Sequence, residues 1–325
     1  MQYSSNLAPK SSINDIQKAA QIFSKKFFKA ETCTETIKYF QEIRTLLRLE
    51  NDHGFQNFTL RLYNILTTKA EKHLSSQVKN FFKDFIVKYS SNVVYRDETI
   101  STPLPRTSHP PDASIFKSPG KIFSAKFKNS SSFNDLPRAC SDTYSLIIGA
   151  GPIGLKYAIE LSILGGKVTI LEKRKIFAQR NNLLHLWKAA IDDLKRMGVK
   201  RIHPLLCTGS INHIEIKTLQ IVLLKIALIS GCQILTGYEY INAQDPGNDI
   251  NRYWKPRCQP YLPSNCLVKD RIDQLIGADG AKTCVTGFEM KHFKGTKIAI
   301  GITANFENLN LQRDKDSQEI PGTVR

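Results

Sequence analysis

The chain has 325 residues, which is enough for about two domains and for a sizeable hydrophobic core. Hydrophobic residues make up 41% and charged residues 23%, a composition that excludes a wholly disordered chain. The 46 lysines and arginines outnumber the 29 acidic residues and give a net charge of +17. This excess favours a polyanionic partner: nucleic acid, anionic lipid or an acidic protein surface.

No membrane span and no secretory signal are expected. The best apolar run, 221–229, is broken by Lys225 and is far shorter than the roughly 20 residues that a span needs. The seven cysteines are odd in number and form no CxxC pair, which favours a reduced, cytoplasmic compartment. The histidines lack zinc-site spacing, so we predict no metal site and read His203 and Cys207 as structural residues.

Residues 1–14 are polar and are predicted to form a disordered tail. Residues 15–95 are predicted to be helical, because apolar residues recur at helical spacing over 16–28, 34–47, 58–67 and 78–89. This part of the chain contains no catalytic constellation.

Residues 96–140 are predicted to be a basic linker or insertion rich in proline and serine. Six prolines lie among serines and lysines there, and the apolar residues have no period. The alternative is a docking segment for an acidic partner.

From residue 141 the pattern becomes α/β. The apolar run 144–148 has the length of a buried parallel strand and leads directly into the loop GAGPIG at 149–154. A helical stretch follows up to the glycines at 165–166, and a second strand at 167–171 ends at Glu172. A glycine loop between a strand and a helix, with an acid after the next strand, predicts dinucleotide binding.

Each glycine of the loop has an expected task. Gly149 permits the tight turn, Gly151 lets a pyrophosphate approach the backbone, and Gly154 lets the helix pack on the strand. The helix N-terminus presents free N–H groups to the phosphates. Glu172 can accept hydrogen bonds from a ribose diol and disfavours a 2′-phosphate. These residues do not distinguish FAD from NAD as the bound dinucleotide.

Three features favour FAD over NAD. Ala158 and Gly165 extend the glycine fingerprint in the manner of hydroxylases that bind FAD through their first fold. A GADG segment at 277–280 follows a hydrophobic run and predicts a late strand that returns beside the cofactor. Polar and cationic residues follow the second strand, where an extended dinucleotide leaves the fold: Lys173, Arg174, Arg180, Asn181 and Asn182.

Longer blocks carry a family resemblance. The blocks are IIGAGPIGLKYAIELSILGGKVTILEKR, RNNLLHLW, CTGSINHIEIKTLQIVLLKIAL and IGADGAKTCVTGFEMKHFKGTKIAIGITANF. With these blocks, residues 146–306 resemble the flavoprotein monooxygenase domain of the MICAL family, and AETCTETIKYFQEI resembles its helical N-terminal part. The resemblance implies an α/β, Rossmann-like FAD-binding fold of flavin hydroxylases over 141–325, incomplete here and preceded by a small helical region.

The resemblance also implies a set of FAD-binding residues. The glycines would line the pyrophosphate, the acid and its neighbours would meet the adenosine ribose, and the Asn pair would contact the flavin side. The set is Gly149, Gly151, Ile153, Gly154, Glu172, Lys173, Arg174, Arg180, Asn181, Asn182, Tyr240 and Asp279. No catalytic side chain is assigned, and His185 and Trp187 are expected to be core and wall residues.

The implied activity is that of a monooxygenase that uses FAD and takes NADPH as co-substrate. It would oxidise methionine of F-actin to the sulfoxide and so promote filament disassembly. The implied partner is the acidic surface of F-actin, without nucleic acid or a membrane span, at the cytoskeleton in the cytoplasm. The oligomeric state stays open.

Two departures from the family pattern shape the expectations. Residues 96–140 have no equivalent in it, and the family's catalytic domain continues beyond the position of Arg325. We therefore expect a partial domain that binds FAD weakly or not at all and turns over poorly. Two alternatives remain: a flavin hydroxylase of another substrate, and a non-catalytic interaction module that keeps the nucleotide fold.

Overall fold

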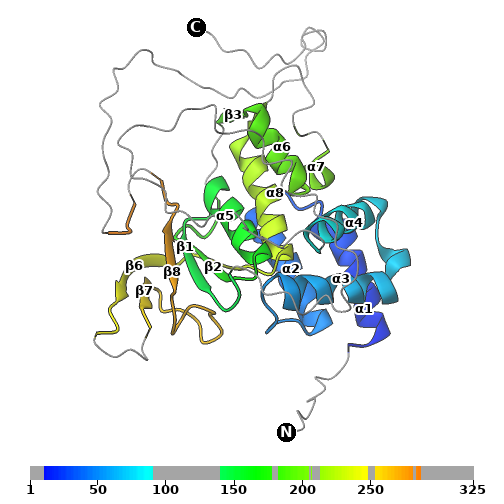
Figure 1. The fold of residues 1–325 in the computed structure, drawn as a ribbon. Helices are drawn as coiled ribbons and strands as arrows, with labels where there is room; N and C mark the ends of the chain where they lie inside the picture. Colours follow the sequence, from blue (N-terminus) through cyan, green and yellow to red (C-terminus); the bar gives the residue numbers. More distant parts are fainter. Residues whose placement is uncertain are drawn as a thin grey trace, which may run out of the picture.

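The computed structural model describes residues 11–90, 140–177, 182–204, 206, 213–247, 253–280 and 283–286. A helical region is followed by an α/β fold that lies beside it (Figure 1). Nearly all of the predicted linker at 96–140, the first ten residues of the predicted tail and the ITANF block lie outside the described residues.

Four α-helices build the helical region, close to the predicted positions. Two π-helical turns, Phe23–Phe27 and Phe55–Thr59, and a 3₁₀ turn at Glu71–His73 connect them. The helices are α1 (Ile13–Ile22), α2 (Cys33–Leu47), α3 (Leu60–Lys69) and α4 (Ser76–Ser90).

Helix α1 begins inside the predicted tail, so the boundary at residue 14 is wrong. The Ser12 hydroxyl accepts a hydrogen bond from the Asp15 amide at 3.1 Å. Such an N-cap satisfies an otherwise unpaired amide and starts the helix at Ile13.

Phenylalanine rings fill the centre of the helical region. Phe23 stacks on Phe27 at 5.1 Å between ring centroids and on Phe82 at 5.5 Å, which joins α4 to the turn after α1. The largest fully buried rings are Phe23, Phe27, Phe40, Phe55, Phe58, Phe81, Phe82 and Phe85. Offset aromatic packing of this kind stabilises the layer beyond simple area burial.

A four-stranded parallel sheet forms the centre of the α/β fold, in the order β5-β2-β1-β8. The predicted strands at 144–148 and 167–172 are confirmed, and the run before GADG pairs in parallel with β1, as expected. The strands are β1 (Tyr144–Ile148), β2 (Lys167–Glu172), β5 (Gln233–Thr236) and β8 (Gln274–Gly277). Helix α5 (Pro152–Ile163) connects β1 to β2. This topology confirms the predicted Rossmann-like class.

Helix α8 (Ile216–Ile229) lies between α5 and the helical region (Figure 1). Its residues 221–229 are all buried, because α5 covers one face of the helix and α2 packs on another. The Thr59 hydroxyl donates to the Ile229 carbonyl at 2.7 Å, and the Gly54 amide donates to the Gly231 carbonyl at 3.0 Å. The two regions therefore share one continuous hydrophobic core.

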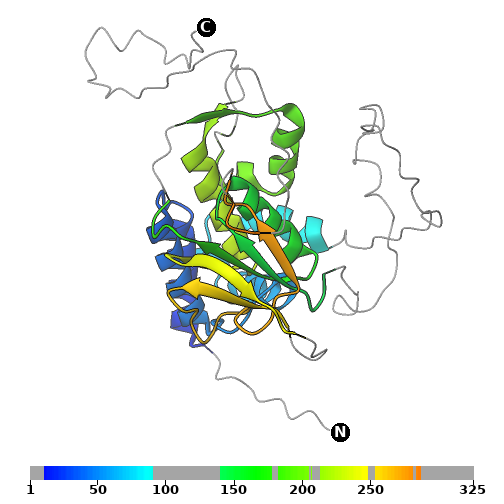
Figure 2. The same ribbon diagram turned by 90° about the vertical axis from the view of Figure 1, so that its left-hand side faces the viewer.

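Smaller elements extend from the sheet. Strand β3 (Leu183–His185) pairs antiparallel with β4 (His213–Glu215), and helices α6 (Lys188–Arg196) and α7 (Val199–Ile202) lie between them in the chain. Strand β6 (Glu239–Gln244) pairs antiparallel with β7 (Lys255–Gln259), and Figure 2 shows this ribbon beside the parallel sheet. Among the described helices, none has the length and apolar character that a membrane crossing requires.

His185 and Trp187 lie at the surface, so their prediction as core and wall residues is wrong. His185 is exposed, and the Trp187 side chain is 80% exposed. The reason is that β3 pairs only with β4 in a two-stranded ribbon, apart from the four-stranded sheet. His185 instead contacts His213 across the ribbon, with 5.2 Å between ring centroids.

Candidate dinucleotide-binding site

The site is built on the loop between β1 and α5. Gly149 has a φ of +103°, a conformation that L side chains rarely adopt. A Cβ atom there would lie 2.6 Å from the Ala278 carbonyl oxygen, so the loop passes directly against the end of β8. Glycine is required at this position by both the turn and the neighbouring strand.

Gly151 and Gly154 have different tasks. A Cβ atom on Gly154 would lie 2.1 Å from the Gly149 carbonyl oxygen, which confirms its predicted role in close packing of α5. Gly154 is buried and does not line the cavity, contrary to the expectation that it lines a pyrophosphate. Gly151 does line the cavity, and its added Cβ would come no closer than 3.9 Å to other protein atoms.

The N-terminus of α5 presents unpaired amides to the cavity. Gly151 is the N-cap, and Pro152, which has no N–H group, occupies the first helical position. The Leu155 amide donates to the Gly151 carbonyl at 2.9 Å. The amide of Ile153, which lines the cavity, meets no acceptor in the part of the chain that the structure describes. Such a helix end attracts anions.

Glu172 ends β2 as predicted and is turned toward the glycine loop. One carboxylate oxygen accepts the Ala150 amide at 3.1 Å, and the other accepts the Arg174 amide at 3.0 Å. The residue is only 8% exposed, yet it lines the cavity. Each carboxylate oxygen has a further lone pair, so the acid can still accept ligand hydroxyl groups.

A cavity of about 260 Å³ lies between the loop, β2, β6 and the end of β8. Most of the predicted cofactor-binding residues meet there: Gly149, Gly151, Ile153, Glu172, Lys173, Arg174, Tyr240 and Asp279. Arg180 and Asn181 lie outside the described residues. Asn182 is exposed and does not line the cavity, and its carbonyl accepts the Ile216 amide at 3.0 Å.

Asp279 and Tyr240 both line the cavity, and their pKa values shift in opposite directions. Burial tends to raise the pKa of Asp279, but hydrogen bonds to Cys284 and Thr283 outweigh it and lower that pKa below its usual value. The Cys284 amide donates to this carboxylate at 2.7 Å. Burial first, and then the neighbouring Cys284 and Cys258, raise the pKa of Tyr240. Asp279 is therefore ionised at neutral pH, and Tyr240 keeps its hydroxyl proton.

The thiol at the start of α2, in the helical region, feels the charge of Glu172. Cys33, at the start of α2, has its pKa raised to about 12 by burial and then by the charge of the Glu172 carboxylate. Both effects disfavour the thiolate, so Cys33 stays protonated at neutral pH.

Other cavity residues were not predicted from the sequence: Ile216, Gln220, Tyr238, Glu239 and Cys284. Gln220 is the most informative, because its amide nitrogen donates to the Ala150 carbonyl at 2.6 Å and fixes the glycine loop to α8. The sequence signal that could have identified Gln220 is a polar residue in a largely apolar helix. Its partner, 70 residues away, could not be found from periodicity.

These features define a class of protein. A glycine turn against a neighbouring strand, an open helix N-terminus and a buried acid at the end of the next strand form a Rossmann-like dinucleotide-binding site. The described residues bring together no group of three or more metal-ligating side chains. Six cysteines are described and none is in a disulfide, whereas Cys207 lies outside the described residues.

Known relatives narrow this class. The chain is 44% identical over 190 residues to the F-actin monooxygenase mical2b of Danio rerio, covering 58% of this chain and 11% of that protein. It is 42% identical over 191 residues to the F-actin monooxygenase MICAL2 of Homo sapiens, covering 58% and 10%. It is also 45% identical over 191 residues to the protein-methionine sulfoxide oxidase mical3a of Danio rerio, covering 58% and 9%. Over this stretch the chain is a homologue of the MICAL F-actin monooxygenases.

The extent of the likeness is limited. The chain spans about a tenth of the length of these three relatives. No protein-family model matches it. Among solved structures, CabE, an aromatic hydroxylase from angucycline biosynthesis, matches with a TM-score of 0.35 and 20% identity, covering 44% of this chain and 32% of that one. A likeness this loose carries no argument about function.

Proposed function

We propose that this chain is the dinucleotide-binding part of an FAD-dependent monooxygenase of the MICAL type. The observation that carries the proposal is the glycine loop pressed against β8, with the Glu172 carboxylate hydrogen-bonded to its Ala150 amide. The identity of more than 40% to monooxygenases over 58% of the chain supports the choice of FAD chemistry.

The residues of the cavity suit the adenosine and pyrophosphate half of FAD. The amides of Gly151 and Ile153 would donate to pyrophosphate oxygens at the N-terminus of α5. Glu172 would accept the ribose hydroxyls, and Lys173 and Arg174 would offset the phosphate charge. Tyr240 would form part of the wall. FAD supplies the redox chemistry when bound, and the protein contributes position and electrostatic field.

The finer assignments extend this proposal. NADPH would be the reductant, and methionine of F-actin would be the substrate, converted to the polar sulfoxide that weakens apolar packing between subunits. The protein would act in the cytoplasm at the cytoskeleton. The relatives are named for F-actin and for protein-methionine, which supports this choice. The net charge of +17 suits an acidic filament.

A charge placed at Gly151 tests the cofactor site. Aspartate is a preferred N-cap and a Cβ atom fits there, so Gly151→Asp is expected to fold normally. Its carboxylate would repel a pyrophosphate at the same spot. We expect FAD affinity, measured by titration with flavin fluorescence, to fall at least tenfold while the urea midpoint stays unchanged.

Gly247→Asp is the matched control. Gly247 follows β6, no atom would lie within 4 Å of its Cβ, and it does not line the cavity. Its φ of +70° is one that aspartate tolerates better than most residues. FAD binding that survives Gly151→Asp unchanged, or a wild-type chain without affinity for FAD, would contradict the proposed site.

The substrate assignment needs a separate measurement. The chain supplied with FAD, NADPH and F-actin is expected to produce methionine sulfoxide on actin, detected by mass spectrometry of actin peptides. NADPH consumption without any actin oxidation would refute actin as the substrate and leave the flavin site standing.

A further inference from the structure

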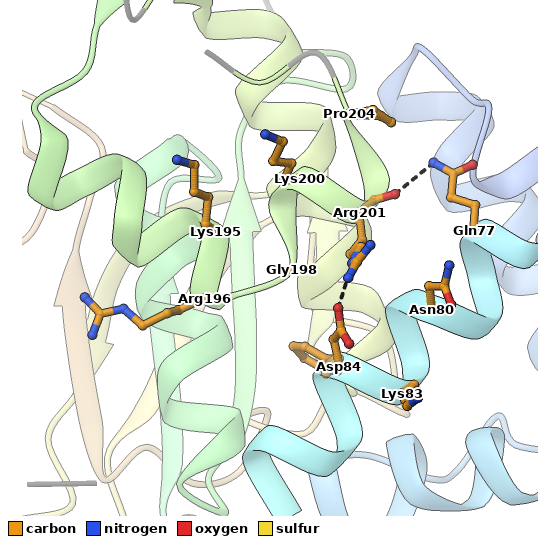
Figure 3. A pocket seen from close by; sticks show the side chains of 11 residues that line it. Gln77, Asn80, Lys83, Asp84, Lys195, Arg196, Gly198, Lys200, Arg201 and Pro204 are labelled. Atoms are coloured by element: carbon orange, nitrogen blue, oxygen red, sulfur yellow. Dashed lines mark hydrogen bonds and ion pairs between the residues drawn. The ribbon is translucent and has the colours of Figure 1, made fainter. Parts of the chain in front are cut away.

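A second cavity lies at the junction of the helical region and the α6–α7 segment, away from the dinucleotide site. It has a volume of about 960 Å³ and shares no lining residue with the first cavity. Helix α4 lines one side, and α6, α7 and the residues that join them line the other (Figure 3). We call it the α4–α7 cleft.

Direct contacts hold the two sides of the cleft together. The Arg201 guanidinium on α7 pairs with the Asp84 carboxylate on α4 at 2.6 Å. The Gln77 side-chain amide donates to the carbonyls of Arg201 and Ile202 at 2.8 and 3.2 Å. Figure 3 shows the Arg201–Asp84 pair and the hydrogen bond from Gln77 to the Arg201 carbonyl. Its walls are therefore fixed relative to one another before any ligand enters.

The charge of the cleft is strongly unbalanced. Five cations line it against the single carboxylate of Asp84: Lys83, Lys195, Arg196, Lys200 and Arg201. Within the described residues, Lys83 and Lys200 meet no carboxylate at ion-pair distance, and Lys195 reaches Asp192 only at 4.0 Å. Like charges around a hollow raise its positive potential and concentrate anions there.

The size of the cleft suits a small-molecule ligand better than a protein partner with a flat surface. Gly198 lines the cleft, and an added Cβ there would lie 3.0 Å from the Phe81 ring, so glycine lets this wall pack closely against α4. The volume is in the upper range of small-molecule sites, which are concave. By contrast, a stable protein–protein interface covers a broad surface of about 800 Å² on each partner.

We propose that the α4–α7 cleft binds a small ligand that carries several clustered phosphate groups. Lys83 and Lys200 would approach it from opposite walls, Lys195 would add charge, and Arg201 would turn from Asp84 toward the ligand. A ligand in this place bridges α4 to α7 and stabilises their packing. Neither the dinucleotide cavity nor the proposed redox chemistry is required for this binding.

The test uses the 325-residue chain and inorganic tripolyphosphate in isothermal titration calorimetry. The wild type is expected to bind tripolyphosphate in the cleft, more weakly as salt is added. The double variant Lys83→Ala/Lys200→Ala is expected to bind about tenfold more weakly, because each lysine–phosphate pair contributes modestly at a partly exposed site. Asp84→Asn is expected to bind several-fold more tightly, because the sole carboxylate is gone.

Matched variants separate this site from general charge. Lys18→Ala/Lys38→Ala removes two exposed lysines from α1 and α2, outside the cleft, and is expected to stay within twofold of the wild type. Gly151→Asp, which blocks the proposed cofactor site, is also expected to keep tripolyphosphate binding. If the two double-lysine variants lose tripolyphosphate affinity equally, the attraction is diffuse and the proposal is overturned.

Further arms identify the source of the phosphates. ATP and inositol hexakisphosphate are titrated beside tripolyphosphate. Tighter binding of ATP would indicate a nucleotide ligand, and tighter binding of inositol hexakisphosphate would indicate a ring that carries phosphates. Should the cleft variants leave all three affinities unchanged but weaken co-sedimentation with F-actin, the cleft is a protein-docking surface and the proposed ligand class is wrong.

Discussion

Lys225 shows how one residue departs from the pattern of its helix. It lies in the middle of apolar α8, is 4% exposed, and its ammonium group donates to the Phe28 carbonyl at 2.7 Å. Burial lowers the pKa of Lys225 to about 8, and the charge of Glu31 opposes this only in part. Burial, and then the positive charge of Lys225, lower the pKa of the nearby His203. A lysine here crosses from α8 to the helical region at the cost of burying its charge.

This lysine predicts a pH dependence of stability. The folded pKa of about 8 is below the unfolded value of 10.5, so the unfolded chain binds more protons between these pH values. The unfolding free energy contributed by Lys225 therefore rises with pH across that window, and the full charge-burial cost applies below it. The stability of the wild type relative to Lys225→Met is expected to rise by on the order of 1–3 kcal/mol from pH 7 to pH 10, measured by urea unfolding.

Lys217 provides the control for this comparison. It lies on the same helix but is exposed. Lys217→Met, measured over the same pH range, gives the effect of removing a surface lysine from this helix, which is subtracted from the effect of Lys225→Met. After this subtraction, a flat difference for Lys225→Met would show that its ammonium is not desolvated in the folded protein.

At the scale of elements, the join between the two regions depends on a few hydrogen bonds at the end of α8. Thr59 is fully buried, and its hydroxyl donates to the Ile229 carbonyl, one of the last carbonyls of that helix. Helix ends leave such carbonyls without partners in their own helix. The π-helical turn that ends at Thr59 thus completes the C-terminus of α8.

Thr59→Val is expected to lower the unfolding free energy by about 1–3 kcal/mol, because the shape is kept and a buried carbonyl loses its donor. Urea denaturation measures the change. Thr67→Val is the matched control, since the Thr67 hydroxyl donates to the Tyr63 carbonyl of its own helix. That carbonyl keeps its position in the backbone ladder, so a change below about 0.5 kcal/mol is expected. Equal effects of the two substitutions would argue against a special role of the α8 end.

At the scale of the whole molecule, the helical region and the α/β fold form one packed body. One hydrophobic cluster spans both and includes Phe40 of α2, Leu224 of α8 and Ile170 of β2. The Gly54–Gly231 backbone contact is too close for any side chain, since a Cβ on Gly231 would lie 2.6 Å from the Gly54 nitrogen. Separation of the two regions would expose apolar surface on both.

One cooperative unfolding unit is therefore expected. In native-state hydrogen exchange with mass spectrometry, the slowest amides of α2, α8 and β1 should exchange with the same free energy and the same urea dependence. If the helical amides exchange by a separate opening of lower free energy, the two regions are independent and the shared core contributes little to stability.

The local elements were predicted well because their signals lie within short stretches of chain. The strand, glycine loop, helix and second strand from Tyr144 to Glu172 follow from apolar runs and glycine spacing. The tail boundary was misplaced because the Ser12 cap was not recognised, and His185 was misplaced because apolar neighbours do not reveal whether a strand joins the main sheet.

The amino-acid sequence by itself determined that a dinucleotide-type loop and its acid would form, because glycine spacing and strand periodicity act over tens of residues. The packing of distant segments was needed to show that Gln220, Tyr238 and Cys284 close the cavity around that loop, and that α4 and α7 enclose a basic cleft. These groups come from distant parts of the chain. Their meeting depends on how buried faces pack, and the residue pattern of any one segment leaves that arrangement open.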